Sequence, residues 1–210
     1  MDADTLRTRV EEEKRTELDR LGSSKLLVGL TDGDLAREPV LELAANSEHA
    51  ARETFRGWAE DEDDPEARAA FEALAEQERE HYERVVELLE DSFEPADGGV
   101  LHTYLRGREG TVQRVGAGMV GRPLYSVRAY TQIIAFFVNE ADVATADLFR
   151  DLKADTEATI DRGGELLASL CEDDEDWDRA AASAEYVVQL VYDDYADALT
   201  ELGLDVKSVC

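Results

Sequence analysis

Hydrophobic residues recur every three or four positions along most of this chain, and no segment alternates like a half-buried strand. Gly22-Ser23-Ser24 and Gly203 are stop signals for the first and last periodic segments. Two stretches without the pattern, 26–34 and 94–113, are expected to be connections. The spacing therefore predicts an all-α protein with helices at about 2–21, 38–61, 65–91, 114–139, 143–171 and 177–202.

The order of these segments indicates how the helices are connected. Asp64-Pro65 has the form of an N-cap followed by proline at the first helical position, so a helix should begin there after a short turn. A pair of long helices, a long crossover and a second pair form a four-helix bundle of the ferritin-like type. We expect the bundle over 37–172, an N-terminal helix and connection over 1–36, and a C-terminal helix and tail over 173–210.

The last predicted helix is amphipathic and must cover an apolar surface. That surface belongs either to its own bundle or to a partner chain. The apolar positions on its face are Tyr186, Val187, Leu190, Tyr195, Ala198, Leu199 and Leu202.

The two helix pairs also resemble copies of each other at an offset of 78 residues. Asp64 falls on Asp142, both at expected N-caps, and Phe71 falls on Phe149. A match of caps, aromatic residues and a leucine pair at one offset indicates an internal repeat. The other matched positions are Trp58/Phe136, Leu74/Leu152, Arg84/Arg162 and Glu87-Leu88-Leu89/Glu165-Leu166-Leu167.

Composition adds a strong charge bias. The 210 residues include 50 Asp and Glu but only 22 Lys and Arg, a formal net charge of −28. A surface this negative repels phosphate backbones and anionic lipid. We therefore expect no nucleic-acid and no membrane partner. High ionic strength screens such self-repulsion, which indicates a halophilic, cytoplasmic protein. No signal peptide or membrane-length apolar run is visible.

The two cysteines, Cys171 and Cys210, form no Cys-x-x-Cys motif, which excludes a rubredoxin-type iron site or a zinc ribbon.

Candidate metal chemistry is concentrated in the first helix pair. Glu78 and His81 are three residues apart, so they share a helix face and can reach one ion. Bundles that hold iron or manganese use this Glu-x-x-His motif together with single glutamates from neighbouring helices. Glu48, thirty residues earlier, is the candidate glutamate.

The segment from Glu48 to Phe55, followed by Asp64-Pro65-Glu66, Phe71, Leu74-Ala75, Glu78 and His81, resembles the rubrerythrin-like branch of the ferritin-like superfamily. The resemblance covers about 38–171 and includes no rubredoxin domain. It implies that Glu48, Glu78 and His81 are metal ligands, and that Phe55 stands where the family often has tyrosine. It also implies peroxide reduction or iron handling at a di-iron centre, which is chemistry of the peroxidase or oxidoreductase type.

The second helix pair departs from that pattern at every ligand position. Under the 78-residue offset, Ser126, Thr156 and Thr159 replace the three ligands, and neutral hydroxyls bind iron or manganese poorly. The flanking acids Asp155 and Glu157 should point away, since one helical position is a rotation of about 100°. We therefore expect a half-site for one ion, iron or else manganese or zinc. A homo-oligomer, most simply a two-fold dimer, could join two such halves.

Two functional hypotheses follow. The first is a rubrerythrin-like protein of iron or oxidative-stress physiology, with a mononuclear site at Glu48, Glu78 and His81. The second is a metal-free bundle that serves as a structural or protein-interaction module, in which the three hydroxyl residues hydrogen-bond to helix carbonyls or to the glutamates. The sequence does not identify a substrate or a redox partner.

Other residues carry weaker signals. His49 should rotate off the face of Glu48, and nothing near His102 completes a site. Cys171 ends a helix in an acidic stretch, which should raise its thiol pKa, and Cys210 could cross-link chains. A basic segment is expected either to form ion pairs with the protein's own acidic surface or to bind an anion or an acidic partner. Its glycines are expected either to allow close helix approach or to mark a kink. Its members are Arg106, Arg108, Arg114, Gly116, Gly118, Gly121, Arg122 and Arg128.

Overall fold

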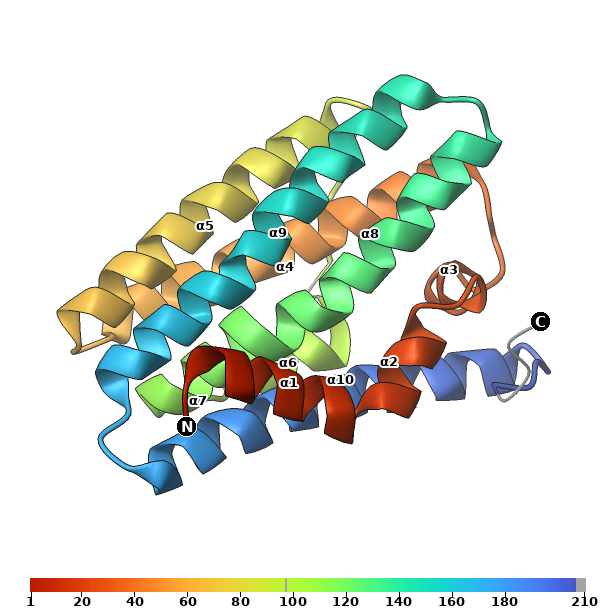
Figure 1. Ribbon diagram of the computed structural model, residues 1–210. Helices are drawn as coiled ribbons and strands as arrows, with labels where there is room; N and C mark the ends of the chain where they lie inside the picture. The colour runs from red at the N-terminus through yellow and green to blue at the C-terminus, as the bar shows by residue number, and fades with distance from the viewer. Residues whose placement is uncertain (97, 207–210) are drawn as a thin grey trace. The chain divides into compact units, whose positions relative to one another are not determined.

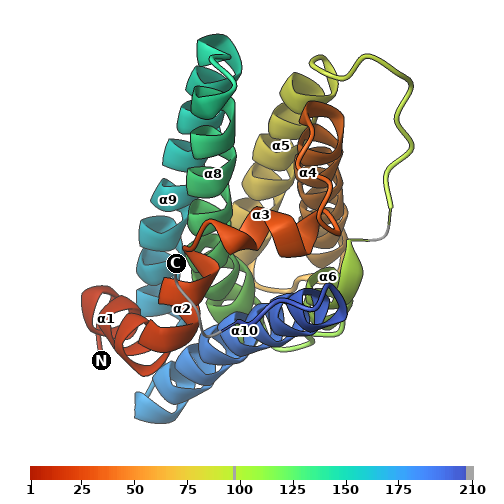
Figure 2. The same ribbon diagram turned by 90° about the vertical axis from the view of Figure 1, so that its right-hand side faces the viewer.

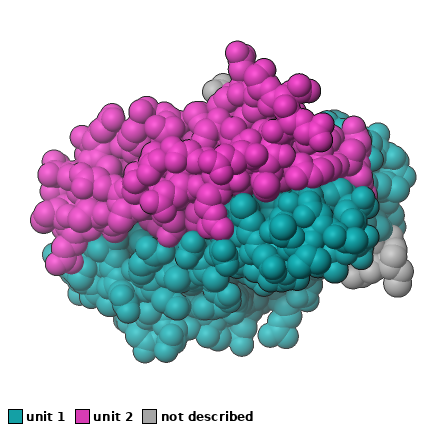
Figure 3. Space-filling model, turned by 90° about the horizontal axis from the view of Figure 1, so that it is seen from above, with its two compact units in different colours: residues 1–33, 112–210 teal, residues 34–111 magenta. Residues whose placement is uncertain are grey.

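The computed structural model describes residues 1–96 and 98–206, and all regular structure in these ranges is helical (Figure 1). The prediction of an all-α protein is confirmed. The helices group into two compact units, one of residues 34–111 and one of residues 1–33 and 112–210 (Figure 3). The three-part division expected from the sequence stays a prediction.

The unit of residues 34–111 is a long helical hairpin with one short helix beside it. Helices α4 (Arg37–Asp61) and α5 (Pro65–Val86) run antiparallel and are joined by a three-residue turn (Figure 2). The crossover that follows was expected to lack helix, but it contains α6 (Gly99–Arg106), which lies against α4. Leu101 and Leu105 are buried there, so tertiary packing stabilises a helix too short to form alone.

The other unit contains the second hairpin, α8 (Arg122–Asn139) and α9 (Val143–Leu170), also joined by three residues. The helix predicted at 114–139 is divided into α7 (Thr111–Val115), the π-helix η1 (Gly116–Gly121) and α8. Pro123 has no N–H for the usual i−4 bond, and the Arg122 N–H bonds to the Ala117 carbonyl five residues back. The change of helix type therefore lies at the proline.

The glycines of η1 allow close helix approach, as one of the two sequence interpretations proposed. A Cβ on Gly116 would lie 2.4 Å from the carbonyl oxygen of Ala180, and a Cβ on Gly121 would lie 2.8 Å from the backbone of Ala184. Both alanines belong to α10 (Asp174–Glu201), the last helix. Only glycine lets the two backbones pack at this distance.

The N-terminal segment was expected to be one helix followed by a connection, and the structure corrects both points. It consists of α1 (Ala3–Glu13), α2 (Arg15–Leu21) and α3 (Lys25–Leu30), with a break at Lys14. Polar contacts join this segment to α10, among them those of Arg9 with Asp178 and Glu185, of Lys14 with Gln189, and of Arg20 with Tyr192. Val187, Tyr195 and Leu199 of α10 are buried, whereas Tyr186 and Leu202 are exposed. Helix α10 thus covers its own unit, and Tyr186 and Leu202 are not part of the covering face.

The order of the elements, two antiparallel pairs separated by a crossover with further helices at both ends, is that of a ferritin-like protein, as predicted. None of the described helices combines the length and hydrophobicity needed to cross a bilayer.

Candidate metal centre

Helix α4 carries the first candidate ligand on its apolar face. Alanines 44, 45 and 51 and Phe55 are buried along this face, and Glu48 is buried among these positions with 1% of its surface exposed. A carboxylate in such a setting costs free energy unless a charged or hydrogen-bonding group compensates it. The burial of Glu48 therefore favours a functional role over that of a surface charge that keeps the protein soluble.

Helix α5 carries the other two candidate ligands. A well-formed N-cap fixes the residue at which this helix begins. The Asp64 side chain accepts hydrogen bonds from the backbone N–H groups of Glu66 and Ala67, with Pro65 at the first helical position, as the sequence predicted. Glu78 and His81 follow on the buried face, 1% and 2% exposed.

A buried glutamate in the turn also fixes this register. The Glu62 carboxylate accepts hydrogen bonds from the N–H groups of Asp63 and Asp64 at 3.1 and 3.3 Å, and from the Thr111 hydroxyl at 2.8 Å. The Arg68 guanidinium donates two bonds to the Glu62 carbonyl, at 2.9 and 2.6 Å. Sequence reasoning missed this role, because one glutamate among five consecutive acids carries no distinguishing pattern.

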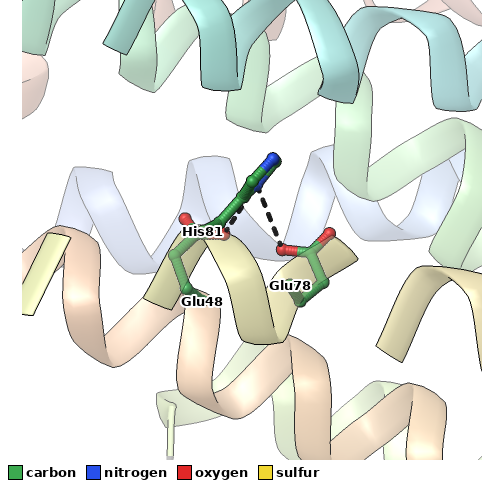
Figure 4. A group of neighbouring side chains, drawn as sticks. All are labelled: Glu48, Glu78 and His81. Atoms are coloured by element: carbon green, nitrogen blue, oxygen red, sulfur yellow. Dashed lines mark ion pairs between the residues drawn. The ribbon is translucent and has the colours of Figure 1, made fainter. Parts of the chain in front are cut away.

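The three candidate ligands converge (Figure 4). The His81 Nδ1 atom lies 3.6 Å from Glu48 Oε2 and 4.0 Å from Glu78 Oε2, and one ligand atom from each residue lies within 4.8 Å of the others. A metal bound at about 2.0–2.2 Å places its ligands about 3–4 Å apart, so these separations leave room for one ion. The donor set of two carboxylates and one imidazole suits iron, manganese or zinc. The residues therefore fit a mononuclear metal site, on the sequence positions that predicted it.

Aromatic packing adjoins the site on the same hairpin. The Phe55 ring lies 6.4 Å from Phe71 and 5.5 Å from Trp58, centroid to centroid, in the heart of the α4–α5 interface. His49 is not a ligand: its ring packs against Tyr82 at 5.4 Å, in agreement with its predicted rotation off the face of Glu48. Glu48, Glu78 and His81 therefore form a buried polar cluster beside apolar and aromatic packing on the same hairpin.

The corresponding positions in the other unit carry no metal-binding donors. Ser126, Thr156 and Thr159 are all buried, and the flanking acids Asp155 and Glu157 are exposed, as expected from helical rotation. The Thr159 hydroxyl donates to the Asp155 carbonyl at 3.2 Å, a bond to its own helix. The buried Thr156 hydroxyl forms no hydrogen bond within the part of the chain that the structure describes.

His102 has a structural role that the sequence did not reveal. It is 2% exposed, and its Nδ1 lies 3.2 Å from the Thr54 hydroxyl, which itself lies 2.7 Å from the Ala50 carbonyl. Because the threonine proton goes to the carbonyl, its oxygen accepts from His102, so Nδ1 carries the hydrogen. These two hydrogen bonds join α6 to α4. His102 and Thr54 are 48 residues apart, so no local sequence pattern predicts their contact.

The basic segment does not form an open patch. Arg114 and Arg122 are buried, and the Arg128 guanidinium donates to the Leu18 and Leu124 carbonyls at 3.1 and 2.6 Å. Burial lowers the pKa of Arg128. The Arg108 guanidinium lies over the Tyr104 ring, 4.2 Å from its centroid. Internal use is the better of the two sequence interpretations, although Arg128 bonds carbonyls rather than carboxylates.

Of the two cysteines, Cys171 lies at the end of α9, where burial and then the charge of Asp176 raise its thiol pKa to about 11. The direction agrees with the sequence prediction, although burial is the larger cause. Cys210 lies outside the described residues.

Fold and site together define a ferritin-like helical protein with a buried, carboxylate-rich candidate metal centre on its first hairpin. The comparison with family models agrees: residues 39–107, which include all three candidate ligands, match the Rubrerythrin family. The match supports the rubrerythrin-like assignment that the sequence motifs predicted. The comparisons with curated proteins and with solved structures found no match.

Proposed function

We propose that this protein holds a single transition-metal ion at Glu48, Glu78 and His81 and acts in iron or oxidative-stress physiology. The observation that carries the proposal is the convergence of two buried carboxylates and one buried imidazole on a single hairpin. Iron is the preferred ion, because the family match covers these residues and mixed carboxylate–imidazole sites suit it.

Each residue has a defined part in such a site. Glu48 and Glu78 supply anionic oxygens, and His81 supplies Nδ1, the ring atom that faces them. A bound ion would supply Lewis-acid or one-electron chemistry at positions not taken by the protein. The apolar interface around the three ligands limits the access of water, which strengthens electrostatic interactions within the site.

The net charge supports a proposal about the protein's partners and its location in the cell. A net charge of −28 disfavours association with nucleic acids or anionic membranes and suits a cytoplasm of high ionic strength. We place the protein in such a cytoplasm.

Metal analysis of the full chain tests the proposal directly. Protein purified without chelator should contain up to about one equivalent of a transition metal, and apo protein with saturating Fe(II) or Mn(II) should melt higher. Free metal at about 100 times the dissociation constant stabilises by about 2.7 kcal/mol, or about 5–10 °C for a chain of this size. Glu78→Gln and His81→Gln should bind at least about ten-fold less metal.

Glu80→Gln is the matched control, since Glu80 is an exposed neighbour on the same helix and its substitution makes the same chemical change. It should retain wild-type metal content. Absence of metal from the wild-type protein, together with a melting temperature that iron, manganese and zinc leave unchanged, would refute the proposal.

That outcome would favour the second candidate, a metal-free bundle that serves as a structural or interaction module. The hydrogen bond from Thr159 to its own helix supports this reading for the second hairpin. Under it, Glu48→Gln and Glu78→Gln should raise the free energy of unfolding, because each removes a buried charge.

A further inference from the structure

The two glutamates of the candidate metal centre are equally far along their helices from the turn that joins them. Glu48 lies 14 residues before the first residue of the turn of residues 62–64, and Glu78 lies 14 residues after its last. At about 1.5 Å per residue, each lies roughly 21 Å from the turn. Phe55 and Phe71, each seven residues from the turn, follow the same rule, and their ring centroids lie 6.4 Å apart. Side chains that meet across this hairpin are therefore level with each other.

The metal centre needs this axial register because its ligands come from two helices. Glu48 belongs to α4, whereas Glu78 and His81 belong to α5 (Figure 4). An axial displacement by the rise of one residue, about 1.5 Å, exceeds the tolerance of roughly 0.5 Å within which a metal site must hold its ligands. Close-packed helices transmit such a displacement along their length. Whatever fixes the two helices at the turn therefore also determines whether the three residues can share one ion.

Glu62 is the residue that fixes the two helices at the turn. One oxygen of its carboxylate, Oε1, accepts hydrogen bonds from the N–H groups of Asp63 and Asp64 and from the Thr111 hydroxyl. Its backbone carbonyl accepts both bonds from the guanidinium of Arg68, a residue of α5. Water competes little for these bonds, since Glu62 is only 5% exposed. The end of α4 is thereby held to the start of α5 through the side chain and the main chain of one residue.

The crossover that follows α5 adds a second constraint at the same residue. It runs alongside α4 in the same direction, because its hydrogen bonds join residues 48 to 52 positions apart along the length of that helix. The bonded pairs are Arg37–Leu88, Glu38–Glu90, Asn46–Ala96, Thr54–His102 and Glu62–Thr111. The bond between Thr111 and Glu62 lies at the C-terminal end of α4. Helix α4 is therefore held in its axial position both by the turn and by the crossover, and Glu62 takes part in both.

We propose that Glu62 is a positioning residue for the metal centre. It acts through the two helices rather than on the ion, by holding α4 and α5 in the register in which Glu48 meets Glu78 and His81. This role rests on the proposed metal site and adds to it a residue of the distant turn that controls its geometry.

Titration of the full-length protein with Co(II) tests the proposal, because the visible absorption of bound Co(II) reports its coordination geometry. Glu62→Ala should weaken Co(II) binding about ten-fold, the lower end of the effect of removing groups that support metal ligands, and should change the spectrum at saturation. Glu62→Gln keeps an acceptor oxygen and should bind Co(II) with wild-type affinity and spectrum. Arg68→Ala should resemble Glu62→Ala, because it removes the bonds to the Glu62 carbonyl but leaves the buried carboxylate in place.

The matched control is Glu60→Ala, the same chemical change at a side chain that is 71% exposed, two positions earlier. It should bind Co(II) like the wild type. Urea unfolding of the metal-free variants measures stability separately, since a merely destabilised protein keeps the wild-type spectrum when it is saturated. A wild-type spectrum in saturated Glu62→Ala or Arg68→Ala protein, or an altered one in Glu62→Gln or Glu60→Ala, overturns the inference. A wild-type protein that binds no Co(II) refutes the metal site itself and this role with it, so the two failures are distinguishable.

Discussion

Replacing Gly116 by alanine places a methyl group against the backbone of α10. The new Cβ would lie 2.4 Å from the Ala180 carbonyl oxygen and 2.8 Å from its Cα, whereas ordinary contact begins near 3.4 Å. Since backbone atoms form the obstacle, no side-chain rotation relieves the overlap. About 1 Å of helix displacement is needed, which would loosen the packing of η1 on α10.

The expected cost follows from this geometry. Overpacking of a close-packed interior costs about 1–3 kcal/mol, and the smaller entropy loss of alanine in a helix returns about 0.5–1 kcal/mol. Gly116→Ala should therefore lower the free energy of unfolding by about 1–2 kcal/mol, or the melting temperature by about 2–8 °C for a chain of this size.

The measurement is thermal and urea unfolding followed by circular dichroism, with Gly57→Ala as the control. Gly57 lies within α4, and a Cβ there meets nothing within 4 Å. Its replacement should raise stability by about 0.5–1 kcal/mol. A Gly116→Ala protein as stable as the Gly57→Ala protein would refute the close approach of η1 and α10.

Three further substitutions or reactions test local features. Thr156→Val should leave the free energy of unfolding unchanged or raise it by about 1 kcal/mol, because it removes a buried hydroxyl that forms no hydrogen bond within the described residues. Asp64→Ala should cost about 1 kcal/mol by removing the α5 cap, measured by urea unfolding. In a Cys210→Ser background, Cys171 should react with iodoacetamide about 100-fold more slowly at pH 8 than a thiol of pKa 9.0, and the rate should rise up to about pH 11.

Each of these has its own control. Thr159→Val removes a hydroxyl that does bond, so it should be less favourable than Thr156→Val, and the opposite order would contradict the assignment. Asp63→Ala changes an exposed neighbour of the cap and should be near neutral. Unfolding in urea should restore the ordinary alkylation rate of Cys171, because burial is the main cause of its raised pKa.

The long helices were predictable because their signals are local. Periodicity and the Asp64-Pro65 cap placed α4, α5, α9 and α10 within a few residues of their observed bounds, the C-terminal end of α5 excepted. Helices α3 and α6 were missed, since six- and eight-residue helices depend on packing rather than on their own sequence. The π-helix was missed as well, because Pro123 predicts an interruption of the α-helix but does not indicate which helix type replaces it.

The candidate site was predictable for the same reason. Glu48, Glu78 and His81 are set by helix periodicity and one short turn, so sequence distance converts directly into spatial position. The link between His102 and Thr54, and the capping role of Glu62, depend on segments about 50 residues apart. Such contacts are fixed only when the chain folds, and no pattern within one helix encodes them.

All three candidate ligands lie within 34 consecutive residues, on one hairpin closed by a three-residue turn. The loop that must close to bring them together is short, so assembling the site costs little chain entropy compared with a cage drawn from the whole protein. During synthesis the ligands also leave the ribosome while most of residues 112–210 remain to be made. We expect the hairpin to bind its ion early, so that metal loading would be a step in folding this chain rather than a final addition to it.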